Sequence, residues 1–164
     1  NGLKKFNGVR RRFEIKNTEN KVMVVDDYAH HPSEIKATIT AAKNGWNKRI
    51  IAVFQPHLYS RTKAFYREFA SALSGADYII ITEIYPAREE KIPGVTSALI
   101  FNQCLKIGQN KCEYIKDLDD LSTFLDKIVK PDDMILTMGA GNIWRYSESY
   151  ADHLSSFKLG LNVG

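Results

Sequence analysis

Three of the four histidines of this 164-residue chain lie in two short polar segments, and each segment directly follows an apolar run. The two segments read Asp26-Asp27-Tyr28-Ala29-His30-His31-Pro32 and Gln55-Pro56-His57-Leu58-Tyr59-Ser60-Arg61-Thr62. Carboxylates, imidazoles and a guanidinium can together bind a charged ligand and move a proton. Packing alone does not explain so many ionisable groups, so we interpret the two segments as parts of one candidate site.

The side chains of the first segment also have structural interpretations. Asp26 and Asp27 could cap a following helix, or a carboxylate here could accept both ribose hydroxyls of a nucleotide. His31 stands directly before Pro32, and the helix start that this proline indicates would fix its position. His30 is therefore the better functional candidate of the two adjacent histidines.

The second segment has the same two interpretations. His57 could be an ordinary loop histidine, but Arg61 follows one helical turn later, and the pair could clamp a carboxylate. Ser60 and Thr62 could cap the helix that begins here. A third segment, Gly139-Ala140-Gly141, is either a tight turn or a loop whose backbone N–H groups face an anion.

A metal site at the first segment is also conceivable. Asp26, Asp27, His30 and His31 are superficially similar to the Asp-His-His motif of manganese phosphoesterases. Two residues separate the acids from the histidines here, and no further acidic motifs supply the other ligands. We therefore expect no metal ligands in this chain.

Hydrophobic periodicity indicates the elements that must position these side chains. Strands are expected at residues 12–16 and 21–25 as an antiparallel hairpin, and then at 50–54, 78–82, 111–115 and 134–138. Helices between and after the strands are indicated by five apolar stripes: Ile35, Ile39 and Ala42; Phe65, Phe69, Ala72 and Leu73; Ile100, Cys104 and Ile107; Leu118, Leu121, Leu125 and Ile128; and Ile143, Tyr146, Tyr150, Leu154 and Phe157.

This alternation predicts a Rossmann-like α/β fold. We expect an open, mostly parallel sheet of about six strands with one antiparallel strand and with helices on both faces. In such sheets ligands bind beyond the carboxyl ends of the strands. Both histidine segments follow strands, so we expect them at two adjacent strand ends.

The composition is that of an ordinary globular protein, with 44% apolar residues, 26% charged residues and a net charge of +4. Basic residues cluster at positions 4–12 without a nucleic-acid-binding motif, so we expect no nucleic-acid partner. No apolar stretch approaches the roughly 18 residues of a membrane span, and no signal peptide is recognisable. Cys104 and Cys112 lack metal-ligand spacing. We therefore predict a single-domain cytoplasmic protein that does not bind membranes.

Five stretches of the chain resemble the C-terminal domains of Mur ligases. The sequence DDYAHHPSE at Asp26–Glu34 is similar to a signature of that family, and VFQPHLYSRT at Val53–Thr62 resembles its alanine-adding members. Similarity continues in the same order at Phe6–Glu14, Glu83–Ser97 and Thr137–Ile143. The members that recycle murein tripeptide are similar around the two histidines but differ in the second motif. Leu58 is a departure, because some alanine-adding members have arginine there.

The resemblance implies an ATP-dependent ligase that joins L-alanine to UDP-N-acetylmuramate in peptidoglycan synthesis. ATP phosphorylates the muramyl carboxylate, and the amine of L-alanine attacks the acyl phosphate. Members have three domains, and the central one carries a GxxxxGK[ST] phosphate loop and the magnesium ligands. That loop is absent from this sequence. We therefore expect residues 1–164 to be one C-terminal domain, with a linker at 1–8 and a loose tail at 159–164, inactive without the rest of the ligase chain.

The resemblance also implies roles for individual residues. Asp27 is expected to bind the ribose of ATP, and Arg12 to reach its phosphates. The L-alanine site is expected to be lined by Tyr28, His30, His57 and Arg61. His30 is also the expected catalytic base for the attacking amine.

Two other classes of function remain open. The chain could be a nucleotide-binding module without catalysis of its own. A nucleotide-dependent oxidoreductase is disfavoured, because no GxGxxG pattern follows the first strand.

Overall fold

The computed structural model describes residues 11–18 and 21–156. The elements in these ranges are β1 (Glu14–Asn17), β2 (Met23–Asp27), α1 (Pro32–Gly45), β3 (Arg49–Phe54), α2 (Tyr59–Leu73), β4 (Tyr78–Thr82), α3 (Ala98–Lys106), β5 (Cys112–Ile115), a 3-10 turn at Leu118–Asp120, α4 (Leu121–Ile128), β6 (Asp133–Met138) and α5 (Ile143–Ser156). The predicted linker at 1–8, Phe157 and the predicted tail at 159–164 lie outside the described residues.

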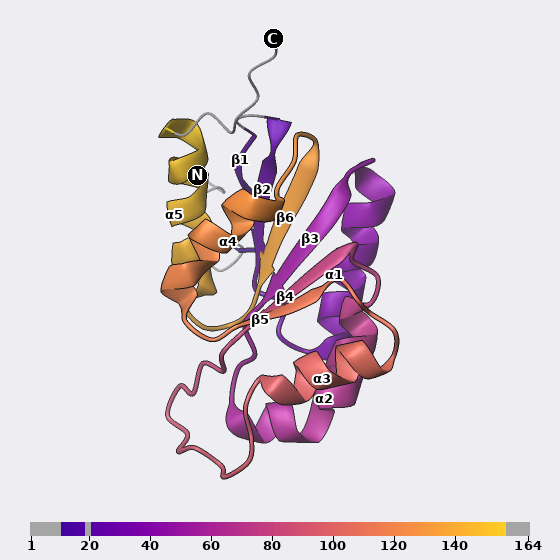
Figure 1. Cartoon of the computed structure of the whole chain (residues 1–164), viewed down its shortest axis with the longest axis vertical. Coiled ribbons are helices and arrows are strands. Elements are labelled where there is room, and N and C mark those ends of the chain that lie inside the picture. Colours follow the sequence, from indigo (N-terminus) through magenta and orange to yellow (C-terminus); the bar gives the residue numbers. More distant parts are fainter. Residues whose placement is uncertain (1–10, 19–20, 157–164) are drawn as a thin grey trace, which may run out of the picture.

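The strands form one six-stranded sheet in the order β1-β2-β6-β3-β4-β5 (Figure 1). β1 pairs antiparallel with β2, and the other neighbours pair parallel. This arrangement confirms the predicted α/β class, the mostly parallel sheet and the leading antiparallel hairpin.

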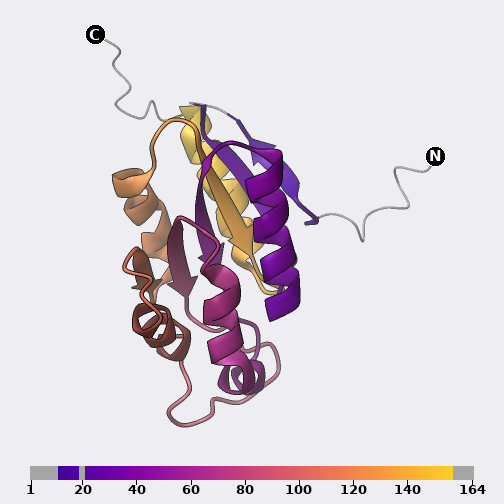
Figure 2. The same cartoon turned by 90° about the vertical axis from the view of Figure 1, so that its right-hand side faces the viewer.

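Helices cover both faces of the sheet (Figure 2). Alternate residues of each central strand point to opposite faces. In β3, Ile50, Ala52 and Phe54 belong to the same core cluster as α1, α2 and α3. Ile51 and Val53 belong to the cluster on the other face, with α4 and α5. A strand that is buried on both faces reads as a continuous apolar run, which is why the strand positions were recognisable in the sequence.

The position of β6 corrects one expectation. We expected the ends of β2 and β3 to be adjacent, but β6 lies between these strands and pairs with both. The chain runs from β2 through β5 with α1, α2 and α3 on one face, and α4 then returns along the other face to place β6 in the middle. The chain adds β3, β4 and β5 in one direction across the sheet and then returns to place β6 between β2 and β3. This reversal of strand order creates a topological switch point, where ligands bind in open α/β sheets.

Three expectations about individual residues were wrong. β1 begins at Glu14 rather than Arg12, because the backbone before it is irregular, with φ of 72° at Arg11 and 47° at Phe13. Phe65 is 41% exposed, because its backbone is not helical and kinks α2. Ile107 is 44% exposed, because α3 ends at Lys106 and leaves it beyond the apolar stripe.

Within residues 11–18 and 21–156, none of the helices is both long and apolar enough to cross a bilayer.

Candidate functional site

His30 lies in the loop between β2 and α1, and its ring orientation is fixed by its own segment. Its Nδ1 is 2.9 Å from the carbonyl oxygen of Tyr28 and 3.6 Å from Oε1 of Glu34. A neutral imidazole that donates from Nδ1 to these oxygens carries its lone pair at Nε2. In this neutral tautomer of His30, Nε2 is the proton acceptor.

The start of α1 holds this loop in place. Pro32 is the first helical residue, and Glu34 accepts hydrogen bonds from the backbone N–H groups of His31 (3.0 Å) and His30 (3.3 Å). Partial burial by itself would raise the pKa of Glu34, but these two hydrogen bonds lower it below its ordinary value. Glu34 is thus an anion that orients the loop, and His31 is the N-cap residue of the helix.

His57 and Arg61 lie one helical turn apart at the end of β3 and the start of α2. Nη1 of Arg61 is 3.3 Å from Nδ1 of His57. Burial lowers the pKa of His57, and the nearby charge of Arg61 and the His30 imidazole lower it further. A neutral His57 can accept from Arg61 at Nδ1 and donate from Nε2, so it is a hydrogen-bond donor rather than a second cation.

The rings of His30 and His57 approach each other across the end of β6, with centroids 6.3 Å apart. We call His30, His57 and Arg61 the histidine–arginine cluster. It combines a proton acceptor, a neutral donor and a cation. These groups can bind a small zwitterion, because the guanidinium pairs with a carboxylate and the imidazole accepts a proton from an amine.

Asp26 and Asp27 have different environments, and neither of them caps α1. The Asp26 side chain is fully buried and pairs with Nε of Arg11 at 2.7 Å. Asp27 accepts backbone N–H groups of Phe13 and Ala29, each at 2.8 Å. The two acids thus bind residues 11–13 to the carboxyl end of β2. The N-cap residue of α1 is His31, so the alternative that Asp26 or Asp27 caps this helix is wrong.

The loop after β6 is packed tightly against its neighbours. A Cβ atom at Gly139, where φ is 150°, would lie 2.8 Å from the carbonyl oxygen of Gln55. The side chain of Gln55 donates to Asn142 at 2.7 Å and accepts the backbone N–H of Ile143 at 3.0 Å. One N–H at the start of α5 is therefore already bonded to protein, and the glycines at 139 and 141 are explained by close packing.

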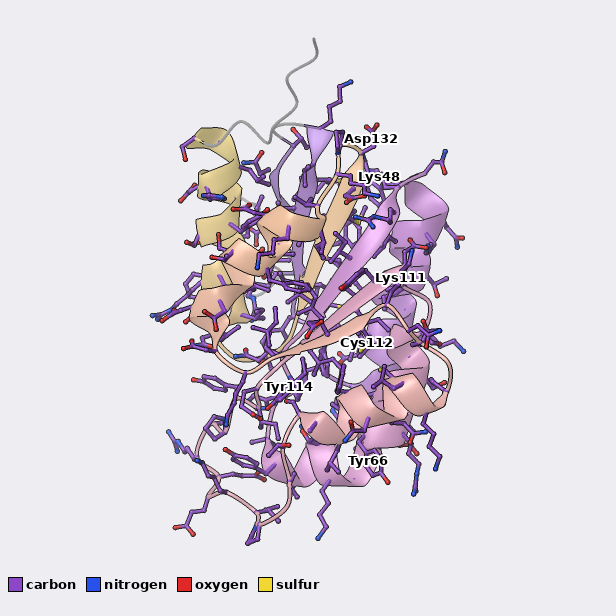
Figure 3. The ribbon with its side chains drawn as sticks, in the orientation of Figure 1. Lys48, Tyr66, Lys111, Cys112, Tyr114 and Asp132 are labelled. Atoms are coloured by element: carbon purple, nitrogen blue, oxygen red, sulfur yellow. The ribbon has the colours of Figure 1, made fainter. Side chains whose placement is uncertain are left out.

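A cleft of about 900 Å³ opens beside the histidine–arginine cluster, at the carboxyl ends of β4 and β5. Its lining includes Gln55, Tyr85, Asn142 and Tyr114. Tyr114 belongs to β5 and is labelled in Figure 3. Beside it, the loop at residues 83–97 extends from the sheet (Figure 1). Glu83 at the start of this loop accepts a hydrogen bond from the Tyr114 hydroxyl and one from the backbone N–H of Ser97.

The structure brings some of the predicted site residues together and leaves others apart. His30, His57 and Arg61 form the cluster, while Tyr28 is 46% exposed with its ring 5.0 Å from that of His30. Arg12 is exposed.

Sequence reasoning missed two residues of this region, Arg11 and Tyr85. Arg11 stands in a run of three arginines that gives no sign of which one turns inward. Tyr85 stacks on His57 with ring centroids 5.9 Å apart, and its place three residues after the end of β4 could have indicated it.

Ser60 and Thr62 have structural contacts. Ser60 donates from both its backbone and its hydroxyl group to Glu89 of the 83–97 loop. The Thr62 hydroxyl donates to the carbonyl oxygen of Leu58 at 2.9 Å. Leu58 itself has a left-handed φ of 74°, which is uncommon for a residue with a side chain.

The part of the chain that the structure describes contains no group of three or more His, Cys, Asp and Glu side chains that could hold a metal ion.

Comparison with known proteins gives a consistent set of matches. A family model described as "Mur ligase, glutamate ligase domain" matches residues 11–141. UDP-N-acetylmuramate–L-alanine ligases from Geotalea uraniireducens and Clostridium kluyveri are 47% and 48% identical and cover 93% and 92% of the chain. The chain spans 33% of each relative's length.

A solved structure of a UDP-N-acetylmuramate-alanine ligase from Thermotoga maritima is also similar. It superposes with a TM-score of 0.73 and 30% sequence identity, over 95% of this chain and 32% of that one.

Proposed function

Because the chain belongs to the Mur ligase family, we propose that it is the C-terminal domain of a cytoplasmic ligase that joins L-alanine to UDP-N-acetylmuramate at the expense of ATP. The domain presents the amino acid, and the remaining two thirds of the ligase supply the acyl phosphate. The relatives' names, the extent of the match and the chemistry of the histidine–arginine cluster support this assignment.

The observation that carries the proposal is the arrangement of His30, His57 and Arg61. An amino acid enters as a zwitterion, and its ammonium group cannot attack until it loses a proton. Arg61 would hold the carboxylate, Nε2 of His30 would accept the proton, and Nε2–H of His57 would donate to the substrate. Tyr28 beside His30 would line the same site.

The nucleotide would bind at the end of β2. Each oxygen of the Asp27 carboxylate accepts one backbone N–H and keeps a further lone pair, which a ribose hydroxyl can use. Arg12 is exposed and directly precedes Phe13, whose backbone N–H bonds to Asp27, and it would reach the phosphates. Magnesium would be held by the other domains of the ligase together with the ATP phosphates.

Phosphate release in the presence of ATP, L-alanine and UDP-N-acetylmuramate tests the proposed function. We expect the full-length ligase to turn over and the 164-residue chain to make no product, because its sequence has no GxxxxGK[ST] phosphate loop. A full-length ligase that releases phosphate with another amino acid but not with L-alanine would contradict the proposed substrate. Turnover by the 164-residue chain, free of contaminating ligase, would contradict the proposal that the other domains of the ligase supply the acyl phosphate.

Asp27→Asn in the full-length ligase is expected to raise the KM for ATP about tenfold and to change the KM for L-alanine little, on the scale of one charged hydrogen bond. Asparagine keeps one acceptor oxygen for the backbone but removes the negative charge that faces the ribose. Steady-state kinetics with ATP and L-alanine varied separately measure the two effects. Unchanged ATP kinetics in a protein with a lowered melting temperature would mean that Asp27 only fastens the chain to β2.

A further inference from the structure

Tyr85 separates the histidine–arginine cluster from the neighbouring cleft. Its ring stacks on the His57 imidazole, with centroids 5.9 Å apart and ring planes 13° from parallel. Tyr85 also lines the cleft, together with Gln55 and Asn142. Among the described residues that line the cleft, none belongs to the cluster. Tyr85 is therefore the residue that both contacts the cluster and lines the cleft.

The backbone of Tyr85 is held in register with the end of β3. Its N–H donates to Pro56 at 2.8 Å, and its carbonyl accepts the N–H of Leu58 at 2.9 Å. These bonds extend the β3–β4 ladder by a parallel bridge between His57 and Tyr85. The ring thus leaves the sheet directly beside the imidazole, and this position depends on backbone pairing rather than on the tyrosine side chain.

The ring of Tyr85 is also held from the side of β6. A Cβ atom at Gly141 would lie only 2.5 Å from Cγ of Tyr85 and 2.7 Å from its Cβ. The glycine therefore allows the tyrosine to pack directly on the loop after β6. With His57 on one face and this loop close by, the ring has little freedom to turn aside.

The space behind Tyr85 is much larger than an alanine side chain requires. Its volume of about 900 Å³ is in the range of sites for whole small molecules, roughly 300–1,000 Å³. Its walls carry the aromatic rings of Tyr114, Phe124 and Tyr146 and the charged groups of Glu83, Lys116 and Lys127. Such a space could hold a long side chain if it were continuous with the cluster.

We propose that Tyr85 is a specificity-determining residue that closes the amino-acid site toward the cleft and so restricts the substrate to a small side chain. The inference rests on the proposed function, because it takes the cluster as the binding site for the amino acid. It goes further in naming the residue that selects by size and the space that a larger side chain would enter. An amino acid with a branched side chain would have to displace the ring from both His57 and the β6 loop.

Variants at position 85 of the full-length ligase test this role. We expect Tyr85→Ala to lower the ratio of kcat/KM for L-alanine to kcat/KM for L-leucine by about tenfold or more, because the cleft then becomes available to the isobutyl group. Tyr85→Phe is the matched control, since it keeps the ring and removes only the hydroxyl, and its ratio should equal that of the wild type. The KM for ATP should stay the same in both variants.

The possible outcomes separate this role from a purely structural one. If Tyr85→Ala loses L-alanine and L-leucine activity in equal proportion, the tyrosine only supports His57 and the inference is overturned, while the proposed function stands. If Tyr85→Ala does not fold, Tyr85→Leu decides, because it keeps apolar volume with a smaller side chain, and an unchanged ratio again overturns the inference. If the wild type and Tyr85→Phe show no L-alanine-dependent phosphate release, both the proposed function and the role of Tyr85 are rejected.

Discussion

Replacing Arg11 by alanine is expected to lower the free energy of unfolding of the chain by about 3–5 kcal/mol, the usual cost of leaving a buried charge without its partner. The Asp26 carboxylate is fully buried, and Nε of Arg11 donates to it at 2.7 Å. The Thr137 hydroxyl also donates to it at 2.7 Å, but a hydroxyl dipole compensates a charge only in part. The guanidinium donates to the carbonyl oxygen of Gly139 at 2.7 Å as well, so its removal leaves two buried acceptors.

Arg12→Ala is the matched control for this prediction. The two arginines are neighbours and have the same charge, but Arg12 is exposed, so its removal should change stability by no more than about 0.5 kcal/mol. Urea denaturation of both variants measures the difference. Adding Asp26→Asn to Arg11→Ala removes the isolated charge and should restore part of the loss. If both arginine variants lowered the free energy of unfolding by the same small amount, water would be able to replace the Arg11 guanidinium beside Asp26, and the prediction would be wrong.

The contacts of Arg11 also connect stability to the candidate site. Its guanidinium lies 5.3 Å from the centre of the Tyr28 ring, and its carbonyl oxygen accepts the N–H of Tyr28. In a longer ligase, residues 11–13 would be where the chain enters this domain. The bonds to Asp26 and Asp27 would therefore fix the direction of the chain relative to the edge of the sheet that carries the candidate site.

Most of the fold could be predicted from the sequence because burial on two faces gives strands an unmistakable apolar run. β4 was predicted at Tyr78–Thr82 and lies there. The order of the strands could not be predicted in the same way. β6 has the same apolar character as β2 and β3, and its place between them depends on which face α4 covers. The face that α4 covers is determined by long-range packing, which leaves no local pattern in the sequence.

The candidate site could be predicted only in part. The strand-end rule located His30 and His57, because it depends on strand positions alone. The inward turn of Arg11 was not predictable, because it depends on left-handed backbone at Arg11 and Phe13, two residue types that rarely adopt it. The stacking of Tyr85 on His57 depends on the register between β3 and β4, which cannot be read from the apolar runs of the two strands alone.

Arg61→Lys in the full-length ligase is expected to reduce kcat/KM for L-alanine by about 1–3 kcal/mol, or roughly five- to 150-fold, and to leave the KM for ATP nearly unchanged. Nη1 of Arg61 is 3.3 Å from Nδ1 of His57, and among the described residues nothing else accepts the guanidinium N–H groups, which can therefore bind a carboxylate. A lysine ammonium is a single point charge, so it cannot keep the bond to His57 and also bind both carboxylate oxygens. The amine of the substrate would then be held less accurately for its attack.

Arg67→Lys provides the control on the same helix. Arg67 is exposed, and its guanidinium lies over the ring of Tyr66, so the same exchange there should leave L-alanine kinetics unchanged. Steady-state rates with L-alanine and ATP varied separately distinguish the alternatives. An L-alanine defect confined to Arg61→Lys is the expected result, because only Arg61 combines a cation with the His57 contact at the end of β3. A silent Arg61→Lys, or a defect seen only when ATP is varied, would rule out the carboxylate clamp and leave the pair as a structural contact at the start of α2.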